Sequence, residues 1–154
     1  MDPAEVQGGS LAIDLGSSNT VVAHQPATGG PPRLLHLPAY SHRDEPIIPT
    51  LLYCANDCTA DHPRSPRQPC LVGRQVIEAG LLETMSQSHP PAGLHYQFKR
   101  SIGARPRSEQ VERAEQGGAL FLDHLWRALQ WQTPPERLVL TAPVDAFAGY
   151  RRWL

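Results

Sequence analysis

The ten residues LAIDLGSSNT, at positions 11–20, constrain the fold of this chain more than any other stretch. An apolar run typical of a buried strand reaches Asp14, a turn of small polar residues follows, and a β-branched run then begins a second strand. Such a turn can present successive backbone N–H groups to an anion, and the carboxylate beside it can hold hydrated Mg²⁺ through water. The stretch predicts two strands, over 10–16 and 20–25, with a turn suited to phosphate; an ordinary hairpin with an acid at its turn is the alternative.

Strand-like and helix-like patterns then follow one another along a single domain of residues 10–154, after a disordered tail of residues 1–9. Strands followed by helices and then by another strand favour an α/β fold with a mixed sheet, a three-strand N-terminal meander and flanking helices. The expected strands cover Arg33–Leu37, 47–53 and a buried strand at 137–142, with a short strand or turn at 71–73. The expected helices cover 74–85, a short segment at 95–102, 113–131 and a segment starting at Phe147.

Composition excludes several classes of partner. The formal net charge is −1 and no block of Lys or Arg occurs, so we expect neither nucleic acid nor an anionic membrane as a partner. No apolar stretch approaches the roughly 20 residues that a membrane span requires. The first residues, MDPAEVQGGS, lack the basic and apolar regions of a signal peptide. We therefore expect a cytoplasmic protein.

The three cysteines raise two possibilities, a disulfide framework and a zinc site. Without export signals they argue against a disulfide framework. Together with a histidine they have the ligand types of a zinc site, although the spacing is looser than the usual one. The four residues of this alternative are Cys54, Cys58, His62 and Cys70.

Basic residues are distributed unevenly between their two types. Of the 14 Lys and Arg residues, 13 are Arg and only Lys99 is Lys. A compact ammonium and a guanidinium fork are not interchangeable. A single lysine in so arginine-rich a chain hints that position 99 requires an ammonium, the alternative being one leftover surface lysine.

The stretch IDLGSSNTVVA, residues 13–23, resembles the first phosphate-binding hairpin of the actin-like ATPase superfamily. Within it, the stretch is most similar to the heat shock protein 70 family of DnaK type. Ser17 and Ser18 stand where that family has two threonines, and Asn19 matches directly.

Four further segments resemble that family in the same order along the chain. FKRSIG, residues 98–103, is similar to the family segment whose lysine acts at the γ-phosphate, and Lys99 falls on that position. In TAP, Pro143 matches a proline that precedes an Arg-bearing helix and takes part in relaying nucleotide state. Arg151 matches the arginine of that relay without a gap, and Arg152 with one inserted residue. The other two segments are 48–51 and 71–77; the loops 38–46 and 55–69 depart from the pattern.

The resemblance implies an incomplete actin-like (ribonuclease H-like) fold that stops before the family's second phosphate loop. It implies ATP and Mg²⁺ as cofactors, with Asp14 orienting the hydrated metal and Lys99 positioning the attacking water. The phosphates would contact Gly16, Ser17, Ser18 and Asn19. Pro143 and Arg151 would relay nucleotide state between domains.

At the level of function, the resemblance implies the N-terminal part of an ATP-dependent molecular chaperone that takes part in protein folding and the stress response. Its partners would be unfolded polypeptides and co-chaperones. ATP hydrolysis would belong to a longer chain, and we expect these 154 residues alone to bind ATP weakly without turning it over. The alternatives are an actin-like filament or scaffold ATPase, a sugar-kinase-like phosphotransferase and an inactive remnant.

Overall fold

The N-terminal hairpin forms where the sequence predicts it. The computed structural model describes residues 8–55, 70–83, 90–143 and 147–154. In it, β1 (Ser10–Leu15) pairs antiparallel with β2 (Asn19–Gln25). Leu11, Ile13 and Leu15 are buried and Asp14 is exposed, because successive residues of a strand point to opposite faces of the sheet.

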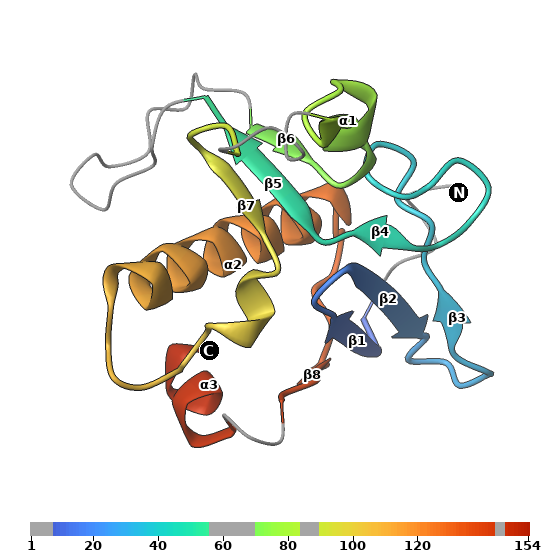
Figure 1. Cartoon of the computed structure of the whole chain (residues 1–154). Helices are drawn as coiled ribbons and strands as arrows, with labels where there is room; N and C mark the ends of the chain where they lie inside the picture. The colour runs from blue at the N-terminus through green and yellow to red at the C-terminus, as the bar shows by residue number, and fades with distance from the viewer. Residues whose placement is uncertain (1–7, 56–69, 84–89, 144–146) are drawn as a thin grey trace.

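Three more short strands join this hairpin in one mixed sheet (Figure 1). β3 (Arg33–Leu34) and β4 (Ile48–Pro49) both pair antiparallel with β2, and β8 (Arg137–Leu140) pairs parallel with β1. The meander is therefore confirmed, but its third strand is shorter than predicted. After Leu34 the chain leaves the sheet, since Leu35 and Leu37 turn into the core. This establishes a mixed α/β architecture.

A second sheet of three strands lies beside the first. Its order is β6 (Cys70–Val72), β5 (Leu51–Cys54) and β7 (Leu94–Tyr96), all antiparallel. The single strand predicted over 47–53 is thus wrong, because β4 belongs to the first sheet and β5 to the second. The helical segment predicted over 95–102 is also largely wrong. Its start is β7, and only the 3₁₀ turn η3 (Phe98–Arg100) is helical.

The helices match the predicted positions with shifted ends. α1 (Arg74–Glu78) stops well before residue 85, followed by Gly80 in the left-handed region at φ 70°. α2 (Glu109–Ala128) begins earlier than predicted because Ser108 caps it; its hydroxyl accepts a hydrogen bond from the Val111 amide at 3.3 Å. α3 is Phe147–Trp153. Within the described residues, no helix combines the length and apolar character needed to cross a membrane.

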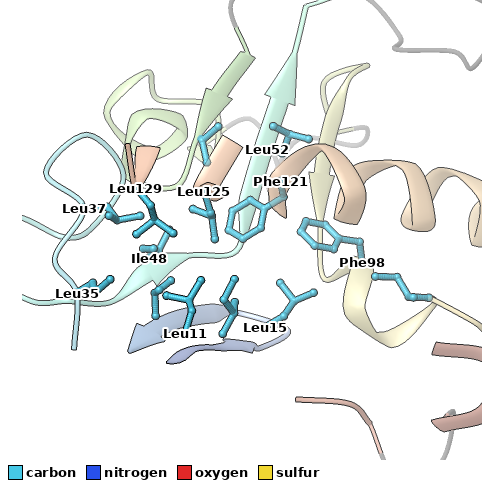
Figure 2. Packing of buried hydrophobic residues seen from close by; sticks show 14 of the residues in the cluster. Leu11, Leu15, Leu35, Leu37, Ile48, Leu52, Phe98, Phe121, Leu125 and Leu129 are labelled. Carbon is cyan, nitrogen blue, oxygen red and sulfur yellow. The ribbon is translucent and has the colours of Figure 1, made fainter. Parts of the chain in front are cut away.

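The main core lies between the hairpin and α2. Figure 2 shows Leu11 and Leu15 of β1 facing a cluster of buried side chains from α2 and β5. The central member is Phe121, which is fully buried and contacts the Phe98 ring at a centroid distance of 5.6 Å. This contact ties η3 to α2. The other labelled members are Leu35, Leu37, Ile48, Leu52, Leu125 and Leu129.

The last strand differs from its prediction in burial. The apolar run at 137–142 predicts a buried strand, yet Leu138 and Val139 are 48% and 49% exposed. β8 lies at the edge of the sheet, and among the described residues only β1 pairs with it. An apolar pattern reports what a strand could bury, whereas position in the sheet decides what covers it.

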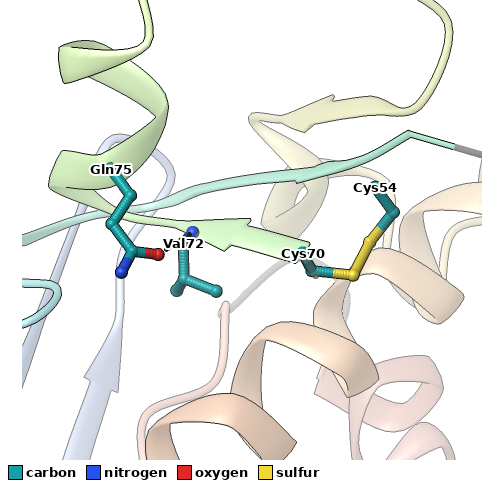
Figure 3. Close-up of a disulfide and its surroundings, with 4 residues drawn as sticks. All are labelled: Cys54, Cys70, Val72 and Gln75. Carbon is teal, nitrogen blue, oxygen red and sulfur yellow. Dashed lines mark hydrogen bonds between the residues drawn. A yellow bond between two sulfur atoms is a disulfide. The ribbon is translucent and has the colours of Figure 1, made fainter. Parts of the chain in front are cut away.

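Two cysteines form a disulfide, contrary to the expectation from the sequence. Cys54 and Cys70 are directly opposed in the antiparallel pair of β5 and β6, with Cα atoms 4.5 Å apart (Figure 3). That separation suits a disulfide, and the pairing of the strands produces it. Beside it, the Gln75 side chain accepts a hydrogen bond from the Val72 amide at 3.1 Å. The disulfide occupies two of the four ligands of the zinc alternative; the other two, Cys58 and His62, lie outside the described residues.

Candidate functional site

The turn of the hairpin is held in shape by close backbone contacts. A side chain at Gly16 would collide with the carbonyl of Asn19, so the turn needs glycine there. The carbonyl of Ser18 accepts a hydrogen bond from the Thr50 amide at 2.8 Å. The buried hydroxyls of Thr20 and Thr50 also lie 2.8 Å apart. The turn is therefore fixed to Thr50, the residue between β4 and β5, while Ser18 and Asn19 remain exposed.

Asp14 is the point where three distant parts of the chain meet. Its side chain is 65% exposed and lies at the end of β1. The Thr141 hydroxyl, just after β8, donates a hydrogen bond of 2.6 Å to the Asp14 Oδ1 atom. The Lys99 Nζ atom lies 3.9 Å from the same oxygen. The fold thus brings together an acid, an ammonium and a hydroxyl that are widely separated in the sequence.

The segment around Lys99 is shaped to present that side chain. Phe98 and Ile102 are buried on either side of it and anchor the segment to the core. Lys99 itself is only 16% exposed, although its ammonium reaches Asp14. Gly103 has φ 73°, and its backbone touches that of Gly149 so closely that neither position has room for a side chain. The segment is thereby packed against α3.

Stability alone explains the pairing of Lys99 with Asp14 poorly. An ion pair with one well-exposed partner contributes less than about 1 kcal/mol, since water screens the attraction. Holding a lysine at low exposure costs side-chain entropy of a similar size. The chain's single lysine lies beside a carboxylate at the end of a strand, and a turn with exposed Ser18 and Asn19 follows that strand. This arrangement suits an anion that carries its own metal ion.

A cavity of about 360 Å³ opens beside the turn. Ser17, Ser18 and Asn19 form one wall, and Thr50 and Gln97 contribute polar atoms to it. Asp14 and Lys99 are not among the residues that line it. The remaining lining residues are His42, Pro49, Leu51, Ile77, Leu82 and Tyr96. The turn thus borders an open cavity on the side that Ser17, Ser18 and Asn19 line.

The single carboxylate at this site, that of Asp14, suits a Mg²⁺ ion that is bound through its water ligands. No cluster of three or more His, Cys, Asp or Glu side chains that could hold a metal occurs in the described ranges. Mg²⁺ gives up its water reluctantly and commonly uses one or two protein carboxylates together with substrate phosphates. Asp14 supplies one exposed carboxylate, which fits a hydrated ion that arrives with a nucleotide. Bound there, the ion would neutralise phosphate charge.

The residues of the predicted relay lie after β8 and on α3. Pro143 is partly buried and follows Thr141 by two residues, so it lies near the end of β8. Arg151 and Arg152 are both exposed on α3. In the described part of the chain, neither arginine forms an ion pair with Asp14. The choice between them stays a prediction.

Two residues of the site have no role in the sequence prediction: Thr50 supports the turn, and Thr141 bonds Asp14. Tyr150 of α3 is fully buried. Burial and, to a lesser degree, the charge of Asp14 raise the pKa of the Tyr150 hydroxyl to about 12. A threonine at the end of a strand is too common to single out, and the position of Tyr150 depends on how α3 packs.

Two comparisons, with protein families and with curated proteins, give no match for this chain. No protein-family model matches the sequence, and no curated protein matches it. The likeness to the heat shock protein 70 family therefore rests on the motifs, and the site geometry is the independent observation beside them.

Proposed function

We propose that residues 10–154 form the first phosphate-binding part of a Mg–ATP site of the actin-like type, within an ATP-dependent chaperone of the heat shock protein 70 family. The observation that carries the proposal is the position of Lys99. The motif requires this lysine to face the hairpin, and its ammonium lies 3.9 Å from Asp14 across 85 residues of chain, from position 14 to position 99.

In this proposal each group has a distinct task. Asp14 would hold the hydrated metal through water, and Thr141 fixes the carboxylate by its hydrogen bond. The amides and hydroxyls of Ser17, Ser18 and Asn19 donate to phosphate oxygens. Lys99 leaves Asp14 for the γ-phosphate when nucleotide binds, and neutralises its charge. Positioning and electrostatics of this kind account for most of the catalysis in phosphoryl transfer.

The described residues surround the proposed ligand on one side only, because Asp14 is 65% exposed. We therefore expect the 154-residue chain to bind Mg–ATP more weakly than micromolar and not to hydrolyse it. The work on unfolded polypeptides with co-chaperones, and the relay through Pro143 and Arg151, belong to the chaperone assignment and follow from the resemblance.

Isothermal titration of the chain with a non-hydrolysable Mg–ATP analogue tests the proposal. We expect saturable, Mg²⁺-dependent binding that the Lys99→Met variant weakens by roughly tenfold or more, because a charge-assisted contact to phosphate is lost. Arg100→Met is the matched control: it removes one positive charge from the exposed neighbouring position of η3 and should leave affinity within about twofold. Metal-independent binding, or equal losses in the two variants, would contradict the proposal.

A further inference from the structure

A cavity of about 520 Å³ is lined by residues of α3 and of the segment that follows η3. Arg105 and Arg107 line it from that segment, and Arg152 lines it from α3. All three arginines are exposed, so a ligand in solvent can reach them. The volume is typical of a site for a small molecule. Positive charge from two distant parts of the chain thus meets at one cavity.

The acids near this cavity neutralise only one of its arginines. Arg107 donates from its Nε atom to the Glu112 carboxylate and from its Nη2 atom to that of Glu115, both at 3.2 Å. Within the described ranges, neither Arg105 nor Arg152 forms an ion pair with a carboxylate. Two guanidinium groups without a counter-charge at one cavity favour a ligand that supplies negative charge.

The walls of the cavity are held in place by contacts of the protein itself. The backbones of Gly103 and Gly149, which both line it, touch each other and join its two sides. The Trp153 indole N–H donates a hydrogen bond of 3.0 Å to the Glu115 carbonyl, which fixes a third part of the lining. A cavity that is already formed costs little reorganisation when a ligand binds.

We propose that this cavity is a second anion site, at which Arg105 and Arg152 together bind a small ligand with two or more negative charges on phosphate or carboxylate groups. A guanidinium fork pairs with the oxygens of either group through two parallel N–H···O bonds. Bound from both sides, the ligand would also stabilise the packing of α3. The site goes beyond the proposed function, because none of its lining residues contacts Mg–ATP in that proposal.

Isothermal titration with pyrophosphate and, separately, with citrate, in metal-free buffer of constant ionic strength, tests the proposal. We expect saturable binding of at least one anion, with a dissociation constant of about 1 mM or lower. Arg152→Gln should raise this constant roughly tenfold, because a charge-assisted contact is lost, and Arg105→Gln should do the same from the other side. Arg151→Gln is the matched control: Arg151 is the exposed neighbour on α3, is not among the lining residues, and should leave affinity within about twofold.

The anion that binds more tightly identifies the group that the site prefers, phosphate for pyrophosphate and carboxylate for citrate. No saturable binding of either anion would overturn the inference, as would equal losses in Arg151→Gln and Arg152→Gln. If Lys99→Met abolishes binding and Arg152→Gln does not, the anion occupies the hairpin site, and the inference is wrong while the proposed function stands. Binding that needs Arg152 but not Lys99, in a chain that does not bind Mg–ATP, would support this site and contradict the proposed function.

Discussion

β1 and β8 are neighbours in one sheet and contribute to the same site, yet they are held in opposite ways. Leu11 and Leu138 are paired across the two strands and lie on the same face, but Leu11 is fully buried and Leu138 is 48% exposed. β1 is fixed by the core beneath it. β8 depends on main-chain pairing and on the bond of Thr141 with Asp14, whereas α3 is held by the buried Tyr150, by Gly149 against Gly103 and by Trp153 against α2.

This difference in burial divides the site into a rigid part, the hairpin, and a more adjustable part at the end of β8. The hairpin supplies the carboxylate and the amides from a frame that cannot move without unfolding the core. Thr141 supplies a hydroxyl just after β8, an edge strand whose Leu138 and Val139 are half-exposed. Elements with few buried apolar contacts open at lower free-energy cost than core elements. We therefore expect ligand-dependent changes to concentrate in β8 and at Thr141.

The largest expected effect is a loss of stability on removing a buried side chain from β1, compared with the same change on β8. Leu11→Ala leaves a cavity in the core and should lower the free energy of unfolding by about 3 kcal/mol. Leu138→Ala, the same change at the paired position on β8, should cost less than about 1 kcal/mol because its side chain is half-exposed. Urea unfolding followed by tryptophan fluorescence measures both. Equal losses would show that β8 is as deeply embedded as β1.

The second effect tests how firmly α3 packs against the segment that ends at Gly103. Gly103→Ala forces a side chain against the Gly149 backbone at φ 73°, and should cost about 2 to 3 kcal/mol. Gly80→Ala is the matched control, since Gly80 has φ 70° with open space around it and should cost only about 1 kcal/mol. Limited proteolysis should then cut Gly103→Ala first within α3. Identical stabilities of the two variants would mean that the contact with Gly149 contributes nothing.

The smallest expected effect is the loss of stability on removing the hydrogen bond between Thr141 and Asp14. Thr141→Val removes the 2.6 Å hydrogen bond to the carboxylate and should cost about 1 kcal/mol, a modest loss because the site is exposed. Thr133→Val, at another exposed threonine, is the control and should change stability by less than about 0.5 kcal/mol. Chemical denaturation resolves the difference. A gain in stability from Thr141→Val would show that strand propensity outweighs the bond to Asp14.

The sequence predicts the parts of the fold that local pattern determines. The hairpin with its turn at Gly16, the long helix α2 and the strand at β8 all form where periodicity and turn residues place them. It fails where tertiary context decides. Leu51 opens a new sheet two residues after Pro49. His95 lies in a strand, because pairing with β5 overrides the local helical pattern.

The residues of the candidate site likewise divide into those that local sequence identifies and those that depend on tertiary packing. Asp14 and Lys99 can be singled out from the sequence, one by its place after an apolar strand and the other by being the only lysine. Thr141 cannot, because its importance comes from the pairing of β8 with β1. The pairing of Cys54 with Cys70 is missed for a similar reason: it follows from the register of β5 and β6.

The central claim, that the hairpin turn and Lys99 face one phosphate ligand, is tested most directly by amide chemical shifts in a ¹⁵N-labelled sample titrated with Mg–ATP. The account predicts that the largest shifts fall on Ser17, Ser18 and Asn19, with a second group around Lys99. Shifts at Ala92 and Arg113, which line another cavity of about 720 Å³, with Ser17, Ser18 and Asn19 unchanged, would contradict it, as would a spectrum unchanged at millimolar Mg–ATP.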